Sequence, residues 1–105
     1  MQTTITARHG DVEADLKARA EQVIARLAQR ITRPVSAHVT FDIEPRPSAE
    51  LVLTAAKNQV HVARAEADDL RTAFDRMTAK FQRQIDKKAP NPKGRAVRPR
   101  KAAAS

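Results

Sequence analysis

Basic residues recur at helical spacing near the carboxyl end of the sequence. They are separated by steps of four, three and four residues, at Arg76, Lys80, Arg83 and Lys87. Because an α-helix turns about 100° per residue, these steps return to one side of a helix. Apolar residues return to another side, at Met77, Phe81 and Ile85. We therefore expect a helix that buries its apolar side and offers phosphate-binding cations on the other.

A second basic flank is expected on an earlier helix. Its members lie beside an apolar series on the helical wheel, at Arg19, Arg26, Arg30 and Arg33. Two such helices, packed side by side on a sheet, would join their basic flanks in one positive groove or ridge. The alternative is a solvated face, in which Lys80 and Arg83 serve local pairing with Asp75 and Asp86.

The formal net charge of +8 is unevenly spread over the 105 residues. The segment 89–105 carries no acid and five cations, at Lys93, Arg95, Arg98, Arg100 and Lys101. We predict one domain over 1–88 and a basic tail over 89–105, which has little to bury and is expected to be disordered alone. Such a charge balance favours a polyanionic partner.

The aromatic residues indicate how a nucleic acid would be held. The sequence has no Trp or Tyr, and its three Phe fall on apolar faces, at Phe41, Phe74 and Phe81. Proteins that read single-stranded bases stack them on exposed aromatic rings. We therefore expect contacts to phosphates and to the shape of a folded RNA, with little reading of sequence.

Signatures of catalysis are missing. There is no cysteine, the two glycines cannot form a phosphate-cradling loop, and His9, His38 and His61 are scattered. We predict no enzymatic activity, metal, cofactor or small-molecule substrate. No apolar run approaches the roughly 20 residues of a membrane span, and no signal peptide is visible. The expected location is the cytoplasm.

Periodicity predicts six elements. Alternating or helical patterns favour strands at 3–8, 35–44, 48–57 and 59–67, a helix at 12–32 and a second helix from Asp68 and Asp69 to residue 88. Asp11 is the expected N-cap of the first helix, and Lys57 to Gln59 a tight turn. In the strand at 35–44, the residues expected to share the inward face are Val35, Ala37, Val39, Phe41 and Ile43. The inward face of the fourth strand stays open, since Val60 and Val62 compete with Ala63 and Ala65.

The order β-α-β-β-β-α predicts an α+β fold. Two helices with one apolar face each would pack on one face of a four-stranded sheet and leave the other face wet. The strands on either side of the first helix would be parallel neighbours, since the helix forms a crossover between them. The second to fourth strands would form an antiparallel meander.

With this order, the chain resembles the ribosome hibernation promoting factor / ribosome-associated inhibitor family in its short form. The resemblance is carried by ITAR at 5–8, by L-x(6)-V-I-A-R-L-A-x-R at 16–30 and by A-R-A-E-A-D-D-L-x-x-A-F-D-x-M-x-x-K-F-x-R-Q-I-x-K at 63–87. It implies a fold like a double-stranded-RNA-binding domain with an extra first strand.

The resemblance also implies a function. It implies binding to rRNA of the small ribosomal subunit, in the channel of mRNA and tRNA, and inhibition of translation in stressed or stationary cells. We expect the free protein to be a monomer. By position, the family's rRNA-contacting residues map onto Arg26, Arg30, Lys80, Arg83, Lys87 and Lys88. The helical spacing described above adds Arg76 to this set.

Three other functions are compatible with a basic chain of this kind to different degrees. A true double-stranded-RNA-binding domain needs lysines at the start of its last helix, where this chain has Asp68 and Asp69. A protein-interaction module would dock an acidic partner on the basic helices. A nucleic-acid condenser would depend on the tail alone, so truncation after Ala89 would abolish its binding.

Overall fold

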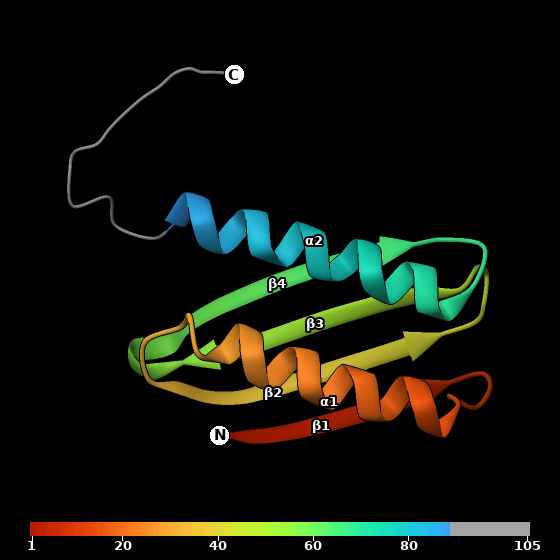
Figure 1. Ribbon diagram of the computed structural model, residues 1–105, viewed down its shortest axis with the longest axis horizontal. Coiled ribbons are helices and arrows are strands. Elements are labelled where there is room, and N and C mark those ends of the chain that lie inside the picture. Colours follow the sequence, from red (N-terminus) through yellow and green to blue (C-terminus); the bar gives the residue numbers. More distant parts are fainter. Residues whose placement is uncertain (89–105) are drawn as a thin grey trace.

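A four-stranded sheet carries both helices on one face (Figure 1). The computed structural model describes residues 1–88. In chain order its elements are β1 (Gln2–Arg8), α1 (Ala14–Ala28), β2 (Pro34–Asp42), β3 (Ser48–Ala55), the 3-10 turn η1 (Ala56–Asn58), β4 (Gln59–Glu66) and α2 (Leu70–Lys88). The predicted order and the α+β fold class are confirmed. The predicted tail, 89–105, lies outside the described residues.

The strands lie in the sheet in chain order, from β1 to β4. β1 runs parallel to β2, with Ile5 opposite Val39, and the two pairs β2–β3 and β3–β4 are antiparallel. Figure 1 shows α1 crossing in front of β1 and β2, while α2 runs along β4. Both edges of the sheet, β1 and β4, are therefore without a further strand in residues 1–88.

The core fills the layer between the helices and the sheet. Every second residue of β2, β3 and β4 faces it, and the largest fully buried side chains are Phe41, Phe74, Phe81, Ile24, Leu27, Leu51, Leu53, Met77 and Val39. The rings of Phe41 and Phe74 lie 5.8 Å apart between their centroids. This packing confirms the apolar stripe predicted for α2 and fixes which flanks of that helix remain free.

Helix α1 is shorter than the predicted 12–32. The Ile31 N–H donates to the Ala28 carbonyl at 3.0 Å, so the chain tightens from helical to three-residue turns after α1 ends. Ile31 still packs against the core, which explains why the apolar series runs on. The expected N-cap Asp11 is also wrong. Glu13 is the N-cap, because Val12 enters the core from an extended segment ahead of the helix.

The second strand is also shorter than predicted. Asp42 ends β2, because its Oδ1 accepts the Glu44 N–H at 3.1 Å and turns the chain out of the ladder. Ile43, expected inward, is exposed. Val35 is exposed as well, since the register shifts between Pro34 and Ser36. The expectation that these two residues face the core is wrong.

The open question about β4 is resolved in favour of the alanines. Ala63 and Ala65 are buried under α2, whereas Val60 and Val62 are exposed on the other face of the sheet. Small side chains on β4 allow the wide aromatic stripe of α2 to approach the sheet closely. The turn before β4 is confirmed, with Lys57 and Asn58 at φ 64° and 59°.

Candidate nucleic-acid interface

The basic flank of α2 lies along β4, the open edge of the sheet. Arg76 Nη1 donates to the Glu66 carbonyl at 3.2 Å, and Lys80 Nζ donates to the Arg64 carbonyl at 3.0 Å. Both carbonyls belong to β4 and have no further strand to bind in the described chain. The two cations therefore cover part of an edge strand that would otherwise offer free carbonyls to other chains.

Together with Arg83, these cations form a surface that we call the α2–β4 ridge, made of Arg76, Lys80 and Arg83. A hollow of about 320 Å³ lies along it and is lined by residues of both α2 and β4. Arg64 pairs with Glu66 at 3.0 Å, so that pair adds little net charge. Within the described side chains, the three ridge cations form no ion pair. A carbonyl is neutral, so it orients Arg76 and Lys80 without cancelling their charge.

The basic flank of α1 has different surroundings. Arg19 Nη2 lies 2.9 Å from Asp75 Oδ1, and Arg30 pairs with Asp86. Both acids belong to α2, so the basic flank of α1 faces the acidic flank of α2. We call this surface the α1–α2 groove, and its members are Arg19, Arg26, Arg30, Asp75 and Asp86. The expectation that the two basic flanks join is wrong, because the acids of α2 lie between them.

The ion pairs of the groove are exposed to solvent. The side chains of Arg19 and Asp75 retain 45% and 48% of their accessible surface, and those of Arg30 and Asp86 retain 46% and 59%. Exposed pairs of this kind contribute only about 0.2–1 kcal/mol each. A phosphate can therefore displace the carboxylate from Arg30 at small cost. Arg26, also exposed, forms no ion pair within the described residues.

The structure describes the side chains of five of the seven predicted contact residues and places them on two surfaces. Arg76, Lys80 and Arg83 share the ridge, whereas Arg26 and Arg30 lie on the groove. The side chains of Lys87 and Lys88 lie outside what the structure describes. Sequence reasoning missed the role of the Arg64 carbonyl, which accepts a hydrogen bond from Lys80 and depends on the register of β4 beside α2. Strand alternation puts Arg64 on the polar face, but pairing with a helix cannot be read from alternation.

The beginning of α2 is acidic and already capped. Asp69 Oδ1 accepts the Thr72 N–H at 2.7 Å, and its other oxygen accepts the Thr72 hydroxyl at 3.1 Å. The backbone hydrogen bond from Thr72 is the main cause that lowers the pKa of Asp69. Asp68 pairs with Arg46 at 3.2 Å. Carboxylates therefore occupy the helix terminus at which a phosphate would otherwise bind.

Two further searches cover residues 1–88 alone. No group of three or more His, Asp or Glu side chains there is arranged to hold a metal ion. Neither α1 nor α2 combines the length and apolar character needed to cross a bilayer.

Comparison with known proteins places the fold. The model of the family described as Sigma 54 modulation protein / S30EA ribosomal protein matches residues 3–90. A ribosomal subunit interface protein from Coxiella burnetii is 20% identical and has a TM-score of 0.65, over 83% of this chain and 96% of its own. The N-terminal domain of Protein Y from Thermus thermophilus is 19% identical, with a TM-score of 0.68, over 80% and 93%. No curated protein matches the chain. At these identities the likeness to solved structures concerns the fold alone.

Proposed function

Since the chain belongs to the Sigma 54 modulation protein / S30EA ribosomal protein family, we propose that it is a ribosome-associated inhibitor of translation. It binds rRNA of the small subunit in the channel of mRNA and tRNA, in stressed or stationary cells. It acts in the cytoplasm as a monomer when free. Its action is steric exclusion of mRNA and tRNA, which requires no catalytic group.

The observation that carries this proposal is the row of uncompensated cations on the α2–β4 ridge. Arg76 and Lys80 are held by β4 carbonyls, so their positions are partly fixed before RNA arrives. Fixed cations lose less side-chain entropy on binding than freely rotating ones. The described surface has no exposed Phe, Trp or Tyr ring, so the ridge suits phosphates of a folded RNA rather than unstacked bases.

The proposed contact residues have unequal roles. Arg76, Lys80 and Arg83 grip phosphates directly from the ridge. By their positions in the sequence, Lys87 and Lys88 extend this row toward the end of α2. From the other helix, Arg26 adds a contact on the groove, and Arg30 adds one by exchanging Asp86 for a phosphate. Five of these seven contacts formed at once predict a slope of log affinity against log salt of roughly −3.5 to −4.5.

Co-sedimentation with purified small subunits tests this function. We expect the Lys80→Glu/Arg83→Glu protein no longer to sediment with the small subunit and no longer to inhibit translation in a cell-free extract. Two cations that bind phosphates are replaced by carboxylates, which repel phosphates. The control Lys17→Glu/Arg71→Glu makes the same change in charge. Both control positions lie in or near the first turn of a helix, where a carboxylate is favourable, so the fold is preserved.

Two outcomes would contradict the proposal. If the Lys80→Glu/Arg83→Glu protein sediments with the subunit as the parent does, the ridge is not the binding surface. If the parent protein is recovered from cell extract in a complex that survives nuclease treatment without rRNA, it docks an acidic protein instead. Folding of each variant is checked by its circular dichroism spectrum.

A further inference from the structure

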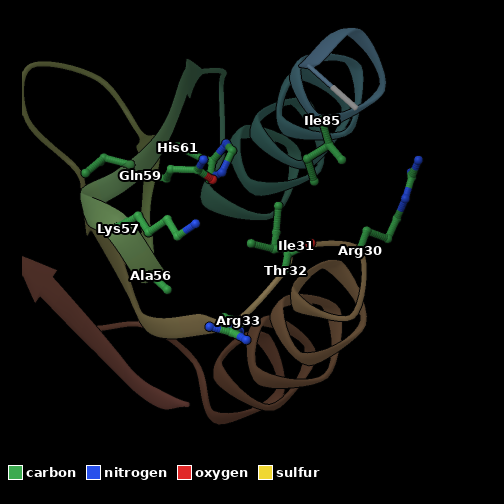
Figure 2. A pocket seen from close by; sticks show the side chains of 10 residues that line it. Arg30, Ile31, Thr32, Arg33, Ala56, Lys57, Gln59, His61 and Ile85 are labelled. Carbon is green, nitrogen blue, oxygen red and sulfur yellow. The ribbon is translucent and has the colours of Figure 1, made fainter. Parts of the chain in front are cut away.

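A second basic feature lies at the end of the molecule where α1 ends and β3 turns into β4. It is a cavity of about 830 Å³, within the range of about 300–1,000 Å³ typical of small-molecule sites. The lining residues that matter here are Ile31, Arg33, Lys57, Val60, His61 and Ile85. Figure 2 shows Lys57 extending toward the hollow from the turn and Arg33 lying at its lower side.

The two cations belong to loops that are tied together. The Ala56 N–H donates to the Arg33 carbonyl at 3.0 Å, which links the segment before β2 to the β3–β4 turn. Arg33 and Lys57 both have a left-handed backbone, with φ of 53° and 64°. Glycine adopts this conformation without the steric cost that a Cβ brings. The chain thus has long cationic side chains at two positions where glycine would cause less backbone strain.

The charge of the cavity is not balanced from within. No carboxylate lines it, and neither Arg33 nor Lys57 forms an ion pair among the described side chains. Arg30, at the rim, is paired with Asp86, and Figure 2 shows it pointing away from the hollow. The cavity therefore presents two uncompensated cations to any small ligand.

The end of α1 does not oppose an anion strongly. Helix carboxyl ends carry partial negative charge on their unbonded carbonyls. Here the carbonyls of Arg26, Leu27 and Ala28 accept N–H groups of the following residues, at 3.3, 3.0 and 3.0 Å. These bonds reduce the negative field that α1 directs at the cavity.

Part of the remaining wall is apolar. Ile31 is half-buried and Ile85 is buried, so together they offer hydrocarbon surface from rim to floor. The imidazole of His61 forms part of the floor and meets the Phe81 ring edge-on, at 6.2 Å between centroids. A ligand of this cavity should therefore be anionic at one end and apolar or planar at the other.

We propose that this cavity binds a free nucleoside phosphate. Its phosphates would bind Arg33 and Lys57, and its base would lie against Ile31 and Ile85. Inorganic phosphate would leave the apolar wall uncovered, and an unphosphorylated nucleoside would leave both cations unused. The site shares no side chain with the α2–β4 ridge, so it stands whether or not the chain binds rRNA.

Titration of the full chain, followed by amide chemical shifts, tests this site. The probes are ADP, GDP, pyrophosphate, adenosine, guanosine and a 5′-phosphorylated tetraribonucleotide. We expect a nucleoside diphosphate to bind more tightly than pyrophosphate or either nucleoside, with shifts around Arg33 and Lys57. In Arg33→Gly/Lys57→Gly the affinity should fall about tenfold or more, since charge-assisted hydrogen bonds are lost while the backbone is relieved.

The matched control is Asn58→Gly. Asn58 has φ of 59° in the same turn but does not line the cavity, so glycine there brings the same backbone relief without removing a cation. We expect it to keep the parent affinity. The proposal is overturned if neither diphosphate binds better than pyrophosphate, or if the double glycine variant binds as the parent does. It is also overturned if the tetraribonucleotide binds these residues and mononucleotides do not.

Discussion

Along the α2–β4 ridge, cations meet neutral backbone carbonyls, whereas along the α1–α2 groove they meet carboxylates. Arg76 and Lys80 donate to the Glu66 and Arg64 carbonyls, while Arg19 and Arg30 pair with Asp75 and Asp86. Both arrangements hold a long side chain in place. Only the first leaves its charge available to a partner.

The difference between the two surfaces has its largest effect on an RNA that is approaching but not yet bound. An approaching RNA is steered by net charge over about one Debye length, roughly 8–10 Å at physiological salt. A carbonyl dipole fades over that length faster than a charge does, so the ridge retains the field of its cations. The groove retains little beyond the charge of Arg26. The two helices have similar basic flanks but differ in the positive charge that they present to RNA. The reason is the orientation of α2, whose acidic flank faces α1.

The variant expected to change RNA binding most removes two cations of the ridge. We expect Lys80→Ala/Arg83→Ala to weaken binding to the small subunit by about 100-fold, or about tenfold for each lost charge-assisted contact. The salt slope should become shallower by roughly 1.4–1.8, since two counterion-releasing contacts are lost. Filter binding at several salt concentrations measures both quantities.

The corresponding variant in the groove removes both partners of one ion pair. Arg30→Ala/Asp86→Ala leaves the net charge unchanged, and we expect a loss below about tenfold. That range corresponds to the weak net value of an exposed pair that a phosphate can displace. A loss as large as that of the ridge variant would mean that Arg30 grips RNA directly and that the two surfaces are equivalent.

The elements were predictable because each has an unbroken period. The stripe from Phe74 to Ile85 and the alternation around Val39 each dictate one buried face, and burial enforces both. Their ends were less predictable. Ile31 continues the helical apolar series from a turn, and Ile43 continues the strand alternation from outside the ladder. At such ends, side-chain pattern and backbone hydrogen bonding diverge.

The site was only half predictable for a similar reason. Spacing alone identified the basic flank of α2, and the structure places Arg76, Lys80 and Arg83 together. Spacing could not tell which neighbour each flank faces. Local pairing of Asp75 and Asp86 within α2 was the open alternative, but Asp75 pairs with Arg19 of α1 and Asp86 pairs with Arg30, just after α1. Partners from another element depend on helix packing, which a one-dimensional pattern does not contain.

A third variant should strengthen binding to the small subunit, by a smaller factor than the ridge variant weakens it. Asp75→Asn/Asp86→Asn removes both acids of the groove and releases Arg19 and Arg30 for phosphate. We expect binding to the small subunit to tighten by about three- to tenfold, because each released cation replaces an exposed ion pair of small value. The same filter-binding assay measures it. Weaker binding in this variant would show that the acids position Arg19 and Arg30 for contact rather than masking them.

The smallest expected effect concerns the pairing energy itself. A double-mutant cycle on Arg19→Ala and Asp75→Ala, followed by urea unfolding, should give a coupling of about 0.2–1 kcal/mol. Alanine's helix propensity cancels in the cycle, so the coupling reports the pair. In 1 M salt, where the Debye length is about 3 Å, it should approach zero. A coupling above about 2 kcal/mol that persists in salt would make the groove a rigid structural contact. Arg19 would then be too tightly held to exchange Asp75 for a phosphate, and the gain in binding expected for Asp75→Asn/Asp86→Asn would have to come from Arg30 alone.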